Sequence, residues 1–210
     1  MPPKPPLLPK PDKLTSLEFI SLSDDSFFEN LDLSGIDAMG SEASDVTIES
    51  SRISRTELTD SALIGLKLTD VFLEKTNLLN ADIEKARLLR VEFLGSRLMG
   101  TKFTTSNLEH VTFKDCSLDY ALFRFSKLKH VRFEKCVLTD ADFQAAELTD
   151  VSFVDCSLEN VEFSHAKLKD IDFSGSKLDG MHATPEQLRG ATIDFSQVTH
   201  FIQLLGIKIK

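Results

Sequence analysis

Three cysteines recur at intervals of twenty residues, at Cys116, Cys136 and Cys156. Evenly spaced thiols can pair as disulfides or bind zinc, so this row is the first candidate for chemistry. Zinc, however, requires a tetrahedral set of ligands, which three residues in one row do not supply. An odd number of cysteines and no secretory signal favour free thiols in a reducing cytoplasm. We therefore interpret them as small buried side chains, and expect no metal or other cofactor.

Two histidines, His110 and His130, repeat the same interval of twenty, and their row continues through Arg90, Asp150 and Asp170. A metal pair would need further ligands that converge on it, and the sequence offers none. We interpret this row as a solvated corner. Elsewhere no Ser-His-Asp arrangement, glycine-rich phosphate loop or carboxylate pair stands out, so the sequence does not predict an enzyme.

The interval of twenty belongs to a shorter repeat that must position all of these residues. Every fifth residue from Phe28 to Leu178 is apolar, at 31 consecutive positions, and 29 of them are Leu, Ile or Phe. The residue two places earlier, from Ser26 to Ser176, is Ser, Thr, Ala, Cys or Val in 27 of 31 cases and is never charged. Two of every five residues therefore point inward, and one of them must be small.

A period of five fits neither the 3.6 of a helix nor the 2 of a strand, so the chain must turn a corner every five residues. Four corners close a square coil of twenty residues, and stacked coils then pair through their backbones at about 4.8 Å. From Phe93 onward the apolar centres alternate Phe and Leu, which puts Phe on two opposite faces and Leu on the other two.

These residues resemble the pentapeptide-repeat proteins, whose repeat is written A(D/N)LXX. Ala141-Asp142-Phe143 and Ala81-Asp82-Ile83 match it closely, and the resemblance covers about residues 26–180. It implies an all-β solenoid: a right-handed quadrilateral β-helix of about eight 20-residue coils, roughly 35–40 Å long at one strand spacing per coil. The ends of such a stack need caps against edge-to-edge aggregation.

Residues outside the repeat divide into three segments. We expect residues 1–13 to form a Pro-rich flexible tail of polyproline-II type, with Pro2-Pro3-Lys4-Pro5-Pro6 as an alternative recognition peptide. Residues 14–25 are expected to form an N-terminal cap, either an irregular plug or a strand. Residues 181–210 are expected to form a helical cap, with one helix over 184–190 begun by a capping box at Thr184–Gln187, a second over 196–205 and a short terminal strand.

The second of these helices is rich in apolar residues, and the whole segment resembles the C-terminal segments of quinolone-resistance pentapeptide proteins, in which two rods join end to end. A lid over the last coil and a homodimer contact are compatible, so both stay open. The candidate contact residues are Val198, Phe201, Ile202, Leu204, Leu205 and Ile207.

Net charge limits the classes of partner. The formal charge of −9 argues against direct binding of nucleic acid, and no apolar run is long enough to span a membrane. The acidic excess is concentrated in residues 1–60, which hold 12 acidic and 5 basic residues.

Several apolar residues fall at positions of the repeat that should point outward, and a contiguous group of them would mark a partner site. They are Leu79, Leu89, Leu94, Met99, Tyr120, Leu122 and Phe125.

The sequence thus predicts a non-enzymatic structural or interaction rod that presents its walls or end to an unidentified protein. The alternative is an acidic DNA mimic that binds a type II topoisomerase, DNA gyrase, as the resemblance to quinolone-resistance members implies. The near-neutral charge of residues 61–210 and the absence of loops that interrupt the repeat weaken this alternative.

Overall fold

The fold is built from a backbone corner at every fifth residue. Each of these residues from Asp25 to Gly180 has a positive φ, between 48° and 73°, and most of them are not glycine. This left-handed conformation costs an ordinary residue about 1–2 kcal/mol, so the corners form only because the coils they close can stack. Four such corners make one coil of twenty residues.

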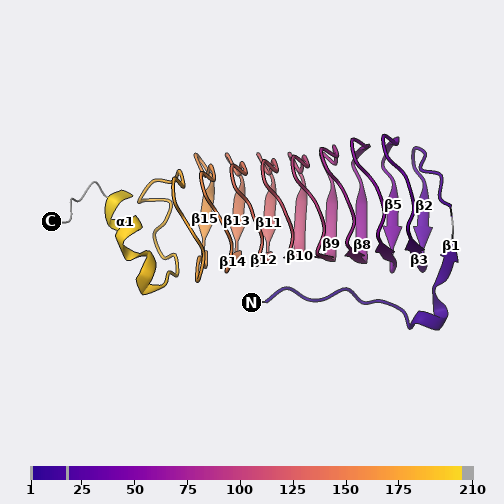
Figure 1. Ribbon diagram of the computed structural model, residues 1–210, viewed down its shortest axis with the longest axis horizontal. Coiled ribbons are helices and arrows are strands. Elements are labelled where there is room, and N and C mark those ends of the chain that lie inside the picture. Colours follow the sequence, from indigo (N-terminus) through magenta and orange to yellow (C-terminus); the bar gives the residue numbers. More distant parts are fainter. Residues whose placement is uncertain (1, 18, 205–210) are drawn as a thin grey trace.

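The computed structural model describes residues 2–17 and 19–204, and its coils stack into a single rod (Figure 1). Each coil hydrogen-bonds to the next in parallel, in a register of twenty residues, as between Val71 and Val91 and between Phe113 and Phe133. The expected right-handed quadrilateral β-helix is confirmed. Of the helices described, none has the length and apolarity for a membrane span.

The strands are short because the corners interrupt them. They are β1 Thr15–Leu17, β2 Phe27–Glu29, β3 Leu31–Ser34, β4 Glu42–Ser44, β5 Thr47–Glu49, β6 Arg52–Ser54, β7 Ala62–Ile64, β8 Lys67–Glu74, β9 Arg87–Leu94, β10 Asn107–Lys114, β11 Lys127–Lys129, β12 Arg132–Glu134, β13 Glu147–Thr149, β14 Ser152–Val154 and β15 Lys167–Lys169. A 3-10 turn, Pro11–Lys13, precedes β1.

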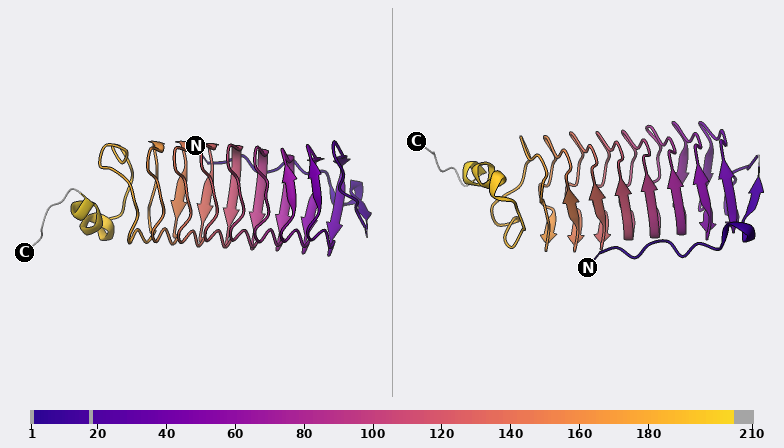
Figure 2. Two further views of the ribbon diagram at one scale, coloured as in Figure 1. Left: turned by 90° about the horizontal axis from the view of Figure 1, so that it is seen from above. Right: turned by 60° about the horizontal axis from the view of Figure 1, so that its bottom comes forward.

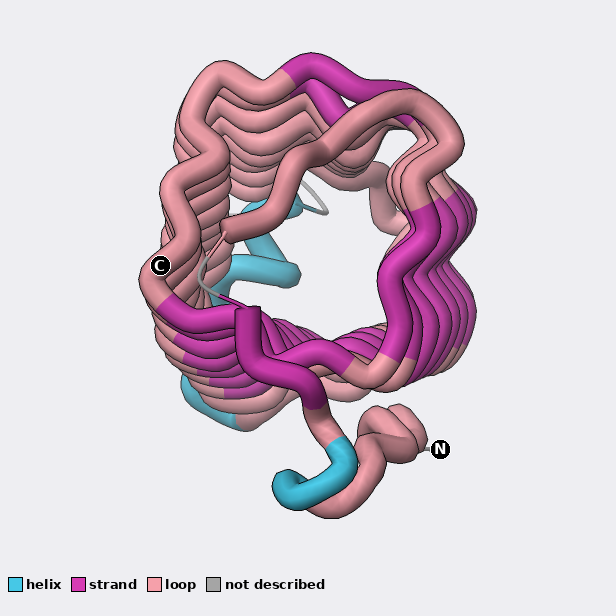
Figure 3. The backbone as a smooth tube through the Cα atoms, turned by 90° about the vertical axis from the view of Figure 1, so that its right-hand side faces the viewer, coloured by secondary structure: helices cyan, strands magenta, loops and turns pink. Residues whose placement is uncertain are grey.

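Four faces follow from the register, and the rod has a four-sided outline when seen from its N-terminal end (Figure 3). Face 1 is centred on the row from Phe28 to Leu168, and face 2 on the row from Leu33 to Phe173. Faces 3 and 4, centred on the rows that begin at Ala38 and Ala43, are held mainly by isolated parallel bridges. Strands β8, β9 and β10 run continuously around the edge between faces 1 and 2.

Two ladders of phenylalanine fill the core. On face 2 the rings of Phe93, Phe113, Phe133, Phe153 and Phe173 stack on one another, and on face 4 the rings of Phe103, Phe123, Phe143 and Phe163 do the same. Stacked centroids lie 4.6–5.7 Å apart, and the ladders meet edge to face at 5.8–6.4 Å. Both geometries are the favoured ones for aromatic pairs, so the predicted Phe and Leu faces are confirmed.

The small inward position of each repeat accepts a hydroxyl because the backbone uses it. Ser106 Oγ accepts a hydrogen bond from the Ala86 amide at 2.9 Å, one coil earlier, and Ser51 Oγ does the same for the Leu31 amide at 3.0 Å. A buried polar group is tolerated when it is paired in this way. Serine and threonine therefore alternate freely with alanine and valine in this row.

The N-terminal cap is a strand, one of the two forms expected: β1 pairs in parallel with β3 on face 2. The preceding Pro-rich segment is extended, but it does not project from the rod as the predicted flexible tail would. It runs back along the outside of the coils, as all three views in Figures 1 and 2 agree. Two of its amides donate to rod side chains, Leu7 to Asp70 at 2.8 Å and Lys4 to His110 at 3.3 Å.

The repeat ends at Pro185 for a steric reason. This residue falls where the next corner requires a positive φ, and the proline ring fixes φ near −65°. The predicted capping box forms, with the Thr184 amide donating to Gln187 Oε1 at 2.8 Å, but the expected helix over 184–190 is wrong: turns follow instead. The expected second helix is observed as a 3-10 turn, Phe195–Gln197, and α1, Val198–Leu204.

Two glutamines close the C-terminal end. Gln187 Nε2 donates to the carbonyls of Phe163 and Ala166 at 2.7 and 2.9 Å, and Gln197 Nε2 donates to those of Phe173 and Ser176, both at 2.6 Å. The two sets are ten residues apart, so the cap repeats the same contact at two successive places. The predicted terminal strand at Ile207 and Ile209 lies outside the described residues.

Ala145 tests the cost of the corners, because it has a φ of 56° with an ordinary side chain. We expect Ala145→Gly to raise the free energy of unfolding by about 0.5–1 kcal/mol, since glycine adopts this conformation without strain. Urea titration followed by circular dichroism measures the change. The matched control Ala121→Gly, at a buried inward position, should destabilise the rod. Equal effects of the two substitutions would contradict the corner argument.

Gln197 tests the cap. Removal of its amide in Gln197→Ala leaves the carbonyls of Phe173 and Ser176 without this donor, and we expect a loss of about 1–3 kcal/mol. Hydrogen exchange should quicken in residues 172–204 and stay unchanged near β8. A change spread evenly over the rod would show that the end coils do not open independently.

Candidate functional site

The cysteine row lies inside the wall of the rod. Cys116, Cys136 and Cys156 are buried and free, at the small inward position of the repeat. The Cys116 and Cys136 thiols donate to the carbonyls of Phe93 and Phe113 at 3.5 and 3.3 Å, as serines in the same row do. The neighbouring thiols and burial raise the pKa of Cys136, which opposes formation of the reactive thiolate. These residues pack the wall.

The histidine row forms the edge between faces 1 and 2, hereafter the 1–2 edge. Its side chains interact in pairs from one coil to the next. Arg90 binds Asp70 through two bonds of 2.6 Å, His110 and His130 stack with centroids 4.8 Å apart, and His130 Nδ1 lies 3.1 Å from Asp150 Oδ2. No group of three metal-ligating side chains occurs among the residues that the structure describes. The interpretation as a solvated corner needs correction, because the Pro-rich segment covers this edge.

Ionisation along the 1–2 edge follows from these contacts. Burial opposes the charge on Asp70, but the Arg90 guanidinium and the Leu7 amide together hold the pKa of its carboxyl below the usual range. Burial, His130 and Lys4 lower the pKa of His110. The neutral imidazole that results can accept a hydrogen bond at Nδ1, and it receives the one from the Lys4 amide.

The outward apolar residues do not form one patch. Leu79 and Met99 lie in one row on face 3, and Tyr120 is at the edge between faces 3 and 4. Leu122 is on face 4 between Lys102 and Asp142, and Phe125 is at the edge between faces 4 and 1.

The last two residues of the predicted patch, Leu89 and Leu94, are half-buried on faces 1 and 2. Only Leu79, Met99 and Tyr120 are therefore brought together on one side of the rod.

Face 3, taken with its edge to face 4, is the acidic wall. Seven of its outward residues are acidic and two, Arg97 and Lys177, are basic. The carboxylates form two groups at the two ends of the face: Asp37, Glu57 and Asp60 in the first, and Asp119, Asp140, Glu159 and Asp179 in the second. Between them lie Leu79 and Met99.

None of these seven carboxylates has an ion pair within 4 Å in the described part of the chain. Each of the other three faces carries ion pairs between neighbouring coils. Lys129 pairs with Glu109 at 3.1 Å on face 1, Lys114 with Glu134 at 2.9 Å on face 2, and Lys102 with Asp82 at 2.9 Å on face 4. On face 3 the carboxylates meet neutral donors instead, such as Asn77 for Glu57 at 2.8 Å. Their charge is therefore not neutralised by a cationic side chain in the described part of the chain.

Tyr120 joins the acidic and apolar parts of face 3. Its side chain is 56% exposed, and the carboxylate of Asp140 raises the pKa of its phenol. Exposed tyrosine next to apolar and charged side chains is typical of protein interfaces. The five-residue repeat alone shows which residues lie on face 3. The lack of counter-ions needed the structure, because it depends on which long side chains reach across coils.

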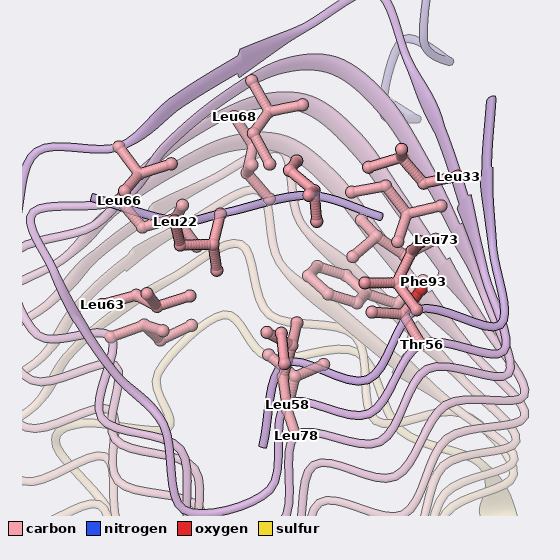
Figure 4. Close-up of a pocket in the computed structure, with 17 residues that line it drawn as sticks. Leu22, Leu33, Thr56, Leu58, Leu63, Leu66, Leu68, Leu73, Leu78 and Phe93 are labelled. Carbon is pink, nitrogen blue, oxygen red and sulfur yellow. The ribbon is translucent and has the colours of Figure 1, made fainter. Parts of the chain in front are cut away.

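The rod has one apolar cavity worth describing, at the N-terminal end where leucine, isoleucine and alanine replace the phenylalanine ladders (Figure 4). Its volume is about 40 Å³, and its lining includes Leu58, Leu63, Leu78 and Phe93. A site for a drug-sized ligand needs several hundred Å³, so we interpret the cavity as loose packing at an open end.

The predicted dimer residues lie in and beyond α1. Val198, Phe201 and Ile202 are half-buried, and Phe201 packs against the core, which agrees with a lid. Leu204 is the last residue of α1, and Leu205 and Ile207 lie outside the described residues. The homodimer stays a prediction. The pattern Asp194–Gln197, which repeats the spacing of Thr184–Gln187, was the available signal for the second cap and was missed.

Solved structures similar to this chain share little sequence identity with it. A trypsin-treated variant of QnrB1, a plasmid-mediated fluoroquinolone resistance protein, is 20% identical, with 94% of this chain and 98% of that chain covered and a TM-score of 0.47. HetL, a heterocyst differentiation protein of the cyanobacterium Nostoc, is 17% identical, with 80% and 87% covered and a TM-score of 0.30. A protein of the Arabidopsis thaliana thylakoid lumen is 14% identical, with 70% and 72% covered and a TM-score of 0.27.

No curated protein sequence matches the chain. A family model described as "Pentapeptide repeat region" matches residues 66–135 and 126–201, well over half of the 210 residues. The match includes the coils with both phenylalanine ladders and the two C-terminal glutamine caps. This chain belongs to the pentapeptide-repeat family.

Proposed function

We propose that the chain is a non-enzymatic interaction module that binds a basic protein surface through face 3. The observation that carries this is the set of seven carboxylates without a counter-ion, divided into two groups around Leu79 and Met99. Lysine and arginine side chains of a partner would pair with the two acidic groups, and an apolar side chain would cover the middle. Unpaired charges at a rim and apolar contact at the centre are the usual arrangement of a transient interface.

The alternative is an acidic DNA mimic that binds DNA gyrase. It is favoured by the same carboxylates, because their rows run along the rod at the strand spacing of about 4.8 Å. It is disfavoured by the middle of the face, where Arg97 and two apolar residues interrupt the acidic rows. A mimic requires a continuous strip, whereas a protein partner with an apolar centre requires this interruption.

Substitution on face 3 tests the proposal. The variant Asp119→Asn/Asp140→Asn/Glu159→Gln removes three unpaired carboxylates at nearly constant shape. We expect it to reduce retention of the partner from cell lysate at least tenfold, and more so at low salt, since exposed charges are screened beyond about 10 Å at 0.1 M salt. Quantitative mass spectrometry of proteins retained by the immobilised full chain measures the change.

The matched control is Glu29→Gln/Glu49→Gln/Glu147→Gln, three carboxylates on face 1, which lies opposite face 3. It removes the same charge from another side of the rod. Equal loss with both variants would contradict a specific role for face 3. Phe125→Asp, on a different edge, should have no effect.

Purified DNA gyrase separates the two candidates. Inhibition of supercoiling that fades with salt and is lost in the face 3 variant would support the mimic. No effect at micromolar protein, together with an apolar-dependent partner lost in Leu79→Ser/Met99→Ser, would support the interaction module.

A further inference from the structure

The first seven residues carry a triplet pattern that the repeat does not explain. Residues 1–7 read Met-Pro-Pro, Lys-Pro-Pro, Leu, so that one residue in three keeps a backbone amide and the other two are proline. A chain of this kind adopts polyproline II, with three residues per turn and no internal hydrogen bonds. Its free amides then all lie along one line, and each can donate only to another part of the molecule.

The 1–2 edge provides acceptors along a matching line. The Leu7 amide donates to Asp70 and the Lys4 amide to His110, so three residues of the segment advance by forty residues of the rod, or two coils. One polyproline turn rises about 9.3 Å, and two coils at about 4.8 Å rise about 9.6 Å. The two repeats are therefore commensurate, and the next acceptor in the same row and register is Asp150.

Residues on the intervening coils hold the acceptors in place. Arg90 fixes the Asp70 carboxylate through two hydrogen bonds, and His130 stacks on His110 while its Nδ1 lies close to Asp150. The edge thus alternates one acceptor with one orienting side chain.

Burial within the segment has the same period of three. Pro3, Pro6 and Pro9 are half-buried, as is Leu8, whereas Pro2, Pro5 and Leu7 are exposed. One proline of each triplet therefore packs on the rod. Pro2 and Pro3 also line a groove with Val131, Arg132 and Asp150, so contact continues past the hydrogen bond to His110.

We propose that the 1–2 edge is a binding site for extended proline-rich peptides of x-Pro-Pro triplets, occupied in this chain by its own residues 2–10. A proline-rich segment of another protein with the same triplets binds there by displacing them. The site is separate from face 3, so its test does not depend on the proposed function. The chain's own segment competes at the effective concentration of a tethered ligand, of millimolar order.

The test uses a fluorescent peptide with the sequence of residues 2–11 and the full-length chain. In the variant Pro3→Gly/Pro6→Gly/Pro9→Gly the rod is unchanged, but its own segment loses the polyproline preference and the packed prolines. We expect this variant to bind the peptide at least tenfold more tightly than the unmodified chain does, as measured by fluorescence anisotropy. No binding to the variant at millimolar peptide would overturn the proposal.

Two peptides test the register. Leu7→Pro removes the amide that donates to Asp70, and Leu8→Pro removes an amide that donates to no protein acceptor among the described residues. Both keep the polyproline conformation. We expect the first to bind about tenfold more weakly than the second, since a hydrogen bond to a charged group contributes about 1.5–3 kcal/mol. Equal binding of the two peptides would overturn the assigned register.

On the rod, Asp70→Ala in the glycine-substituted variant should weaken peptide binding at least tenfold, while Asp155→Ala, on another edge, should not weaken it. His110→Ala provides a second edge variant if Asp70→Ala disturbs the fold, as checked by circular dichroism. An unchanged peptide affinity in both edge variants would place the site elsewhere and overturn the proposal.

The same contact predicts a pH dependence. His110 accepts from Lys4 only when neutral, and its pKa is lowered in the docked state, so release of the segment is coupled to proton uptake. Docking should be complete above about pH 6.5 and weaken as the pH falls below that value. The charged groups facing His110 are Lys4, Glu109, Lys129 and His130, with Asp70, Arg90 and Asp150 further along the edge.

A nitroxide on Pro2→Cys measures this docking, because the three native thiols are buried in the wall of the rod and the new thiol is not. It should broaden the amide signals near Val131 and Val151 at pH 8 and broaden them less at pH 5. In His110→Asn the difference between the two pH values should disappear. An unchanged pH response in that variant would show that another group controls release.

Discussion

The whole structure depends on a left-handed corner at every fifth residue. Such a corner is unfavourable alone, and about thirty of them persist because each closes a coil whose backbone pairs with two neighbours. The cost explains why the repeat needs so many apolar centres: phenylalanine ladders and their leucine counterparts supply the burial that offsets it. It also explains why the repeat stops abruptly, since Pro185 cannot adopt the required φ.

A rod built in this way gives each outward residue one neighbour on the coil before and one on the coil after. Charged side chains therefore form rows along the rod. In some rows neighbouring side chains form ion pairs, and in others the charges have no partner of opposite sign. Faces 1, 2 and 4 hold ion pairs such as Lys129–Glu109 and Lys102–Asp82, while the described carboxylates of face 3 have no such partner. Since exposed ion pairs contribute little to stability, this difference matters more for binding than for folding.

The 1–2 edge is a third kind of row, in which acceptors alternate with the residues that orient them. It matters because its spacing agrees with that of a polyproline helix, a match between two periodic backbones that needs no deep pocket. The acidic face and the proline-binding edge lie on different sides of the rod, so the protein can contact two partners without competition between them.

The sequence alone determined the solenoid, its register of twenty, the inward rows and the placement of phenylalanine on two opposite faces. It could do so because a period of five, with a small residue two places before each centre, fits a coil with a corner at every fifth residue. In such a fold each coil contacts only the coil before it and the coil after it. It also located the capping box at Thr184–Gln187, although turns rather than a helix follow it.

Only the tertiary structure decided what the surface does. The docking of residues 2–10 on the 1–2 edge depends on contacts between Leu7 and Asp70, 63 residues apart, which no local pattern encodes. Whether a charge is paired likewise depends on the reach of long side chains across coils, and that is a property of the folded rod.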